Sequence, residues 1–183
     1  MTSSRFHLLM APNRGQMLRS TIAVVMLGMC CAAGAQTNAD DPDWSESETP
    51  TPPLVDFSKL VPFEGAGSSS LAYGIDPATI RITASDGLVR YVIVASNHTG
   101  ARNVMYEAIR CATGEFKTYA RYSADGRWNN ISAPQWQSVF GSKPSKHAFY
   151  LARSGVCDGG APVSSAAAIV RRLKYQNFKT TDF

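Results

Sequence analysis

The chain has 183 residues, with 18 Lys and Arg, 14 Asp and Glu and a formal net charge of +4. This length allows one domain of ordinary size and argues against two full domains. Hydrophobic residues make up 44% and charged residues 17%, which excludes a wholly disordered chain. Composition alone points to no particular chemistry.

Residues 1–35 have the three parts of a secretory signal peptide. The positive charges come first, and they are Arg5, Arg14 and Arg19. The apolar run TIAVVMLGMCC over residues 21–31 follows, and Ala33 and Ala35 supply the small side chains of a cleavage site before Gln36. The run is too short to cross a bilayer, which argues against an uncleaved anchor. We therefore predict a periplasmic or secreted protein with no transmembrane segment after cleavage.

Residues 36–60 form an acidic leader in front of a single basic domain predicted over residues 61–183. The leader holds six acidic residues against Lys59 alone, whereas residues 61–183 hold fourteen basic residues against eight acidic ones. Its richness in Asp, Glu, Ser, Thr and Pro is typical of a disordered linker. A second interpretation stays open, in which the leader folds back onto the basic domain with Trp44 or Phe57 as its anchor.

Five β segments with short turns follow in the basic domain. They cover residues 79–85, 88–96, 104–112, 115–123 and 127–131. Asp86-Gly87, between the first two segments, is a strong hairpin signal because both residue types tolerate turn conformations. Short connections between successive strands predict an antiparallel β-meander of about five strands.

Two helices are predicted after the strands. The first covers residues 145–153, and the second starts at a cap formed by Ser164 or Ser165 and ends at Tyr175. Helices that follow an antiparallel sheet predict an α+β fold, with both helices packed on one face of the sheet.

Two of the four cysteines remain once Cys30 and Cys31 leave with the signal peptide. Cys111 and Cys157 are an even pair in an oxidising compartment, so we predict a disulfide between them. In the chain-entropy model a bridge closing a loop of about 47 residues stabilises by about 4 kcal/mol. The alternative, a catalytic or metal-binding thiol, has neither a CxxC motif nor a third cysteine to support it.

Several short motifs lie along the predicted strands and just after them. They are Arg90-Tyr91, Asn103-Val104, Tyr106-Glu107, Arg110-Cys111, Tyr119-Ala120, Trp128, Trp136 and Cys157. As a set, with DPDWSESETPTPP upstream and HAFYLARSGVC downstream, they resemble the CNP-one-like family of secreted proteobacterial proteins over residues 41–175. Ser154-Gly155-Val156 departs from the bulkier run expected before the second cysteine. The resemblance implies no established activity and therefore transfers no mechanism.

Candidate catalytic residues are few, because the chain after the signal peptide holds only two histidines, His98 and His147. His98 lies in a predicted turn and His147 in a predicted helix. Neither has the HxH, HxxE or HExxH spacing of a metal site. We therefore predict no catalytic residue, no metal ligand and no cofactor.

Glu107 is the acidic residue of most interest, because it alternates with apolar residues along its strand and is expected to face inward. A buried carboxylate needs a partner. We predict a buried ion pair between Glu107 and Arg110, with Arg90 and Arg121 as the other available cations. A general acid at Glu107 is the functional alternative.

Basic and aromatic side chains interleave along the strands, which favours a ligand-binding sheet face. The residues predicted to face a ligand are Arg90, Arg110, Lys117, Tyr119, Arg121 and Trp128. Strict alternation predicts that Lys117, Tyr119 and Arg121 project from one side of one strand. Outside the cytoplasm a nucleic acid is not expected, and an anionic envelope glycan or an acidic protein is the candidate partner.

The function predicted from these features is a non-catalytic binding or cell-envelope interaction module. One alternative is an envelope hydrolase that uses Glu107 with a histidine. A further alternative is a protein whose acidic leader masks its own basic face until a partner displaces it.

Overall fold

The structure, a computed structural model, describes residues 41–64, 70–141 and 146–181, which lie in one compact unit, Asn38–Phe183. Side chains are described as far as Tyr175. The predicted signal peptide lies outside the described residues, and its cleavage and export stay predictions.

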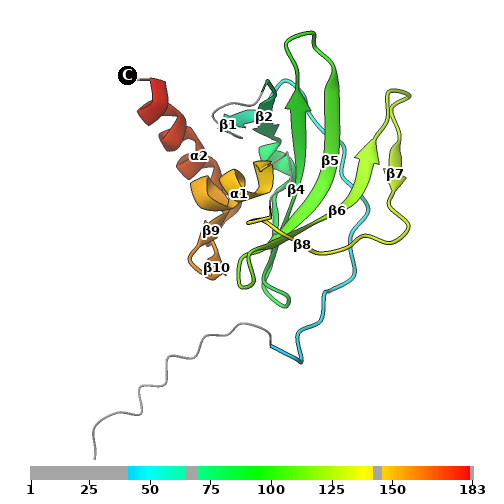
Figure 1. Ribbon diagram of the computed structural model, residues 1–183, viewed down its shortest axis with the longest axis vertical. Helices are drawn as coiled ribbons and strands as arrows, with labels where there is room; N and C mark the ends of the chain where they lie inside the picture. The colour runs from blue at the N-terminus through cyan, green and yellow to red at the C-terminus, as the bar shows by residue number, and fades with distance from the viewer. Residues whose placement is uncertain (1–40, 65–69, 142–145, 182–183) are drawn as a thin grey trace, which may run out of the picture. The chain divides into compact units, whose positions relative to one another are not determined.

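Eight of the described strands form one antiparallel sheet in the order β1-β2-β4-β5-β6-β7, with β3 beside β4 and β8 beside β6 (Figure 1). Their bounds are β1 Val61–Phe63, β2 Ala72–Ile75, β3 Arg81–Thr83, β4 Leu88–Ser96, β5 Arg102–Arg110, β6 Glu115–Tyr122, β7 Trp128–Asn130 and β8 Gln137–Ser138. The predicted meander is confirmed in β4 to β7. The sheet has more than the five strands expected, because β1, β2 and β8 add short strands to it.

The two central strands, β4 and β5, are buried almost throughout. The near-continuous apolar run of β4 is what a strand covered on both faces requires. On one face Val89, Tyr91 and Ile93 pack in one apolar cluster. On the other face Val92 and Val94 belong to a second cluster. The sheet therefore has two buried faces and needs a covering layer on each.

Helices cover the face that contains Val89, Tyr91 and Ile93, which we name the helix face. They are α1, His147–Leu151, which continues into the π-helical turn η2, Ala152–Val156, and α2, Ala166–Thr181. A 3-10 turn, η1, covers Pro77–Thr79. Both helices lie on the same side of the sheet in Figure 1, which confirms the predicted α+β arrangement.

Helix α2 begins and packs as its sequence predicts. Ser165 Oγ accepts a hydrogen bond from the amide of Ala168 at 3.2 Å, which caps the helix. Ile169 and Leu173 are fully buried against the sheet. Gly155 in η2 approaches α2 so closely that a Cβ there would lie 2.7 Å from Leu173 Cδ2. Glycine at this position lets η2 and α2 pack against one another.

The predicted disulfide between Cys111 and Cys157 is confirmed, with the two Cα atoms 5.6 Å apart. Cys111 directly follows β5. Cys157 begins β9, Cys157–Asp158, which pairs with β10, Ala161–Pro162, in a small hairpin. The bridge therefore ties the segment between the two helices to a central strand of the sheet.

Residues 41–60, which we name the strap, run in a mostly extended path over the second face of the sheet, the strap face (Figure 1, cyan). Val55, Phe57 and Leu60 pack against the apolar cluster of that face. This differs from the disordered linker expected from composition, and it agrees with the second interpretation of a leader that folds back. A few aromatic and apolar residues spaced along the strap bury apolar surface against the sheet, although the overall composition of the strap is polar.

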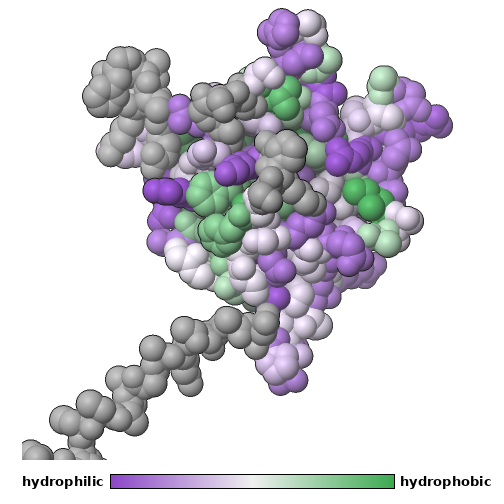
Figure 2. All heavy atoms as spheres, in the orientation of Figure 1, coloured by the Kyte–Doolittle hydropathy of each residue, from purple (hydrophilic) through white to green (hydrophobic). Residues whose placement is uncertain are grey.

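The coloured part of the surface in Figure 2 is mostly hydrophilic, with apolar residues in small separate clusters. Among the described residues, no helix combines the length and the apolar character needed to cross a membrane.

Candidate functional site

Five of the six residues predicted to face a ligand lie on the strap face, and the strap contacts all five through polar groups or rings. Trp128 donates from its indole Nε1 to the carbonyl of Pro53 at 3.1 Å. The guanidinium of Arg110 lies 3.8 Å from the ring centroid of Trp44. These contacts show that the strap occupies the part of the sheet face that was expected to bind a ligand.

Glu46 of the strap fills the basic centre of this face. Its Oε1 accepts a hydrogen bond from Tyr119 Oη at 2.6 Å, and its Oε2 forms an ion pair with Lys117 Nζ. Arg90 Nη2 lies 3.9 Å from Oε1. Burial alone would raise the pKa of Glu46, but the hydrogen bonds from Lys117 and Tyr119 hold it below the usual 4.5. The strap thus supplies the anion that the basic face was predicted to bind.

Asp86, predicted only as a turn residue, is the second acid of this cluster. It is buried, and its carboxylate accepts from Arg90 Nη2 at 2.9 Å and from the amide of Ser47 at 3.2 Å. Trp44 Nε1 donates to the carbonyl of Asp86 at 2.9 Å. Despite burial, which raises it, the pKa of Asp86 is lowered by hydrogen bonds from Ser47, Leu88 and Arg90. The hairpin turn is therefore also the dock for the strap.

Arg121, the sixth predicted residue, lies on the opposite face because β6 contains a β-bulge. Tyr106 pairs with Ala120, whereas the next residue, Glu107, pairs with Thr118, so Tyr119 is an extra residue in β6. A bulge reverses the alternation of side chains beyond it. The expectation that Lys117, Tyr119 and Arg121 share one side is therefore wrong for Arg121.

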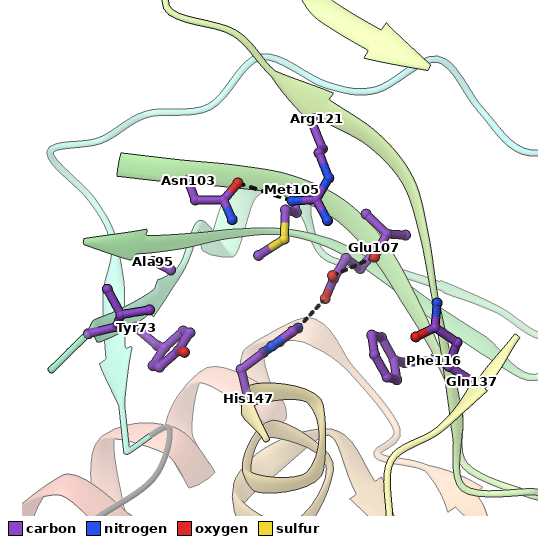
Figure 3. A pocket seen from close by; sticks show the side chains of 11 residues that line it. Tyr73, Ala95, Asn103, Met105, Glu107, Phe116, Arg121, Gln137 and His147 are labelled. Atoms are coloured by element: carbon purple, nitrogen blue, oxygen red, sulfur yellow. Dashed lines mark hydrogen bonds and ion pairs between the residues drawn. The ribbon is translucent and has the colours of Figure 1, made fainter. Parts of the chain in front are cut away.

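Arg121 lines a cavity of about 440 Å³ on the helix face, between the sheet and α1 (Figure 3). Its lining residues come from β2, β4, β5, β6, β8, α1 and the residue before β2. They are Leu71, Tyr73, Ala95, Asn103, Met105, Glu107, Phe116, Thr118, Arg121, Gln137 and His147. The volume is in the range of small-molecule sites, about 300–1,000 Å³.

Glu107 and His147 form an ion pair at the floor of this cavity. His147 Nε2 lies 2.8 Å from Glu107 Oε2, and both side chains are buried. Thr118 Oγ1 donates to Glu107 Oε1 at 2.8 Å, and Tyr91 Oη donates to Oε2 at 3.4 Å. Glu107 thus faces inward as expected, with all of its hydrogen-bonding partners contributed by neighbouring elements.

The predicted pair of Glu107 with Arg110 is not formed. The two residues lie three apart on β5, so their side chains point to opposite faces of the sheet. Arg110 lies on the strap face, with its Nη1 4.0 Å from Glu115 Oε2. His98 is exposed in the turn between β4 and β5, as expected from its sequence, and it does not line the cavity.

The surroundings of His147 favour its charged form. Burial lowers its pKa, but the negative charge and hydrogen bond of Glu107 outweigh this, and the pKa is raised above 6.5. The positive charge of Arg121 acts in the opposite direction. The groups that face His147 from the sheet are Glu107 on β5, Arg121 on β6, Tyr73 on β2 and Phe116 on β6.

The remaining lining combines apolar walls with polar groups. Tyr73 stacks on the imidazole of His147 at 5.8 Å between centroids, and Phe116 meets it edge-on at 5.6 Å. Arg121 and Asn103 lie on neighbouring strands beside Met105 (Figure 3). In the parts of the chain described by the structure, no cluster of three His, Cys, Asp or Glu could hold a metal ion. The arrangement is suited to holding an organic molecule by one polar end.

Sequence reasoning paired Glu107 with a histidine only as an alternative, identified Arg121 separately, and missed the cavity that they share with His147. Tyr73, Asn103, Phe116 and Gln137 were not predicted as site residues. Alternation along β5 could have grouped Asn103 and Met105 with Glu107, because residues two apart share a face. The meeting of β5 with α1, 40 residues later in the chain, leaves no local signal.

Comparison with protein-family models matches residues 39–174 to the CNP1-like family, which confirms the resemblance predicted from the sequence motifs. No curated protein and no solved structure gives a match. The matched region begins before the strap, so it includes the strap, both faces of the sheet and every residue that lines the cavity.

Proposed function

Because the chain belongs to the CNP1-like family, whose model spans both the strap and the cavity, we propose that it is an exported, non-catalytic binding protein. Its ligand enters the cavity beside His147. The observation that carries the proposal is that the protein's own chain covers one face of the sheet and leaves a cavity on the other. The protein's own strap occupies the basic centre of one face, whereas the other face holds a cavity of about 440 Å³ lined by polar and apolar groups.

Export is part of the proposal and has two supports. The first 35 residues have the charge and apolar pattern of a signal peptide. The Cys111–Cys157 disulfide fits an oxidising compartment, where such bonds form and persist.

The chemistry of the lining favours binding over catalysis. Glu107 is fully buried, and its carboxylate accepts from Thr118, Tyr91 and His147, so its oxygens are committed to structural partners. Among the described lining residues there is no serine or cysteine that His147 could activate as a nucleophile.

Hydrolysis is the second candidate, and the 2.8 Å contact between His147 and Glu107 favours it. A carboxylate that orients an imidazole is the supporting half of many hydrolytic sites. In that case His147 would act as general base towards water or a substrate hydroxyl in the cavity. Turnover of chromogenic esters or glycosides by the wild-type protein, lost in Glu107→Gln, would establish this candidate in place of binding.

Met105 provides a direct test of the binding proposal. It lines the cavity, and it is the only methionine after residue 29. In the processed protein, selective ¹³C labelling of methionine methyl groups therefore gives a reporter inside the proposed site. We expect small amphipathic molecules to shift this resonance in a saturable manner. A methyl resonance that no member of a chemically diverse small-molecule set shifts would contradict the proposal.

A further inference from the structure

The inference below rests on the proposed function and concerns the ligand of the same cavity. We infer that the ligand is a small amphipathic anion, whose carboxylate or phosphate group binds Arg121 and Asn103 and whose apolar body lies against Tyr73, Met105 and Phe116.

The first observation is the state of the cation in the cavity. Arg121 is exposed, and its Nη1 donates to Asn103 Oδ1 at 3.3 Å. Over the described residues no carboxylate lies within ion-pair distance of it, whereas Arg90, Lys117 and Arg127 each pair with one. Arginine presents a planar fork of donors that matches carboxylate and phosphate oxygens. A cation that keeps only an amide partner is ready to accept an anion.

The second observation is that the cavity's own acid does not neutralise Arg121. The carboxylate of Glu107 is buried at the floor and pairs with His147 at 2.8 Å. Its remaining hydrogen bonds come from Thr118 and Tyr91. The electrostatic effect of Arg121 reaches His147, since it opposes the protonation that Glu107 favours. An anion bound at Arg121 would relieve this opposition and favour a protonated His147.

The third observation is the apolar wall beside the cation. Met105 pairs with Arg121 across β5 and β6, so the two side chains lie on the same face as neighbours. Tyr73 and Phe116 enclose the His147 ring from two sides, as Figure 3 shows. A ligand held at Arg121 therefore meets aromatic and thioether surface along the rest of its length.

A series with one apolar body and different head groups tests this inference. The probes are octanoate, octyl phosphate, octan-1-ol and octylammonium, with the Met105 methyl shift showing where each binds and titration calorimetry giving its Kd. We expect octanoate or octyl phosphate to bind at least about tenfold more tightly than octan-1-ol, with octylammonium weakest. Comparison of octanoate with octyl phosphate then separates the two anionic sources.

Substitutions of Arg121 test the assigned contact. Arg121→Gln should reduce octanoate affinity to that of octan-1-ol, and Arg121→Lys should keep a preference for the anion with a weaker Kd. Arg171→Gln, which removes an exposed arginine of α2 that does not line the cavity, is the matched control and should change nothing. Thermal melts of each variant confirm folding.

The outcomes separate the inference from the function on which it rests. If octan-1-ol or octylammonium shifts Met105 as strongly as octanoate does, the cavity binds ligands but the anionic class is wrong. Octanoate binding that survives Arg121→Gln would also overturn the inference. If none of the four probes shifts Met105, the evidence of binding in this cavity fails, and the proposed function fails with the inference.

Discussion

The strap face and the helix face are two sides of the same strands, and both receive basic side chains. On the strap face, Glu46 and Asp86 meet the cations Lys117 and Arg90. On the helix face, Glu107 pairs with His147, and Arg121 keeps an amide as its partner. The difference teaches that the cation count of a sheet does not locate a binding site. The position of the counter-ions does.

The covering layers are also attached by different means. The Cys111–Cys157 bridge fixes the segment between the helices to the sheet covalently. The strap is held by ion pairs, the Trp44 and Trp128 indoles and apolar contacts. Chemical reduction should therefore act on the helix face, and loss of the ion pairs that Glu46 forms should act on the strap face.

Loss of the disulfide is expected to have the largest effect. Cys111→Ala with Cys157→Ala opens a bridge between residues separated by 46 positions. The free energy of unfolding should fall by about 4 kcal/mol, because the unfolded chain gains entropy. Urea denaturation monitored by circular dichroism measures this. A loss below about 1 kcal/mol would show that non-covalent packing alone attaches the helix layer.

Removal of the charge of Glu46 is expected to have the next largest effect. Glu46→Gln leaves the buried Lys117 ammonium without its carboxylate and should cost about 1–3 kcal/mol in unfolding free energy. Glu48→Gln, an exposed neighbour in the same segment, is the matched control. Proteolysis within residues 41–60 should become faster only in Glu46→Gln. Equal behaviour of the two variants would show that the strap is held without this ion pair.

Acidification should weaken the attachment of the strap, whereas a rise in pH should weaken the contact between α1 and the sheet. The lowered pKa of Glu46 means that its contribution is complete above its ordinary value of 4.5 and is lost as the pH falls through its folded-state value. The raised pKa of His147 means that its contribution is complete below 6.5 and is lost as the pH rises through its folded-state value.

Each face contains its own natural probe for this pH experiment. The three tryptophans, Trp44, Trp128 and Trp136, all contact the strap face, whereas Met105 reports on the cavity. Tryptophan fluorescence should change on acidification and the Met105 methyl resonance on passing from acidic to alkaline pH. Coincident changes of both probes would contradict independent responses of the faces.

Arg121→Gln should have the smallest effect on stability, within about 0.5 kcal/mol, because the side chain is exposed and forms no ion pair among the described residues. The same substitution should raise the pKa of His147, since it removes a positive charge that lowers it. An NMR titration measures the shift, with His98 as an internal reference. An unchanged titration of His147 would mean that the two groups do not interact.

The sequence predicted the strands β4, β5 and β6 closely. Apolar, aromatic and β-branched residues recur along them, and glycine turns at Gly100 and Gly114 separate them. The short strands β1 and β2 were missed, because three or four residues give too little alternation to recognise. The strap was obscured by its composition, since only a few residues anchor an otherwise polar segment.

The cavity was less accessible to prediction than the fold. Alternation placed Glu107 inward, and the helical pattern placed His147 on a helix, but their pairing depends on how α1 packs on the sheet. The side chosen by Arg121 depends on the bulge at Tyr119, and strict alternation gives the opposite answer. The packing of α1 on the sheet and the bulge at Tyr119 therefore determine which charged side chains line the cavity.

Because of the bulge, the site depends on the number of residues in β6 as well as on their types. Regular alternation of these same residues, without the bulge, would turn Arg121 towards the strap and Tyr122 towards the cavity, whereas deleting the extra residue Tyr119 would close the bulge and leave Arg121 facing the cavity. The one extra residue in β6 therefore decides which face of the sheet receives the positive charge of Arg121. The spacing of residues along β6 is thus itself a determinant of what the cavity of this protein can hold.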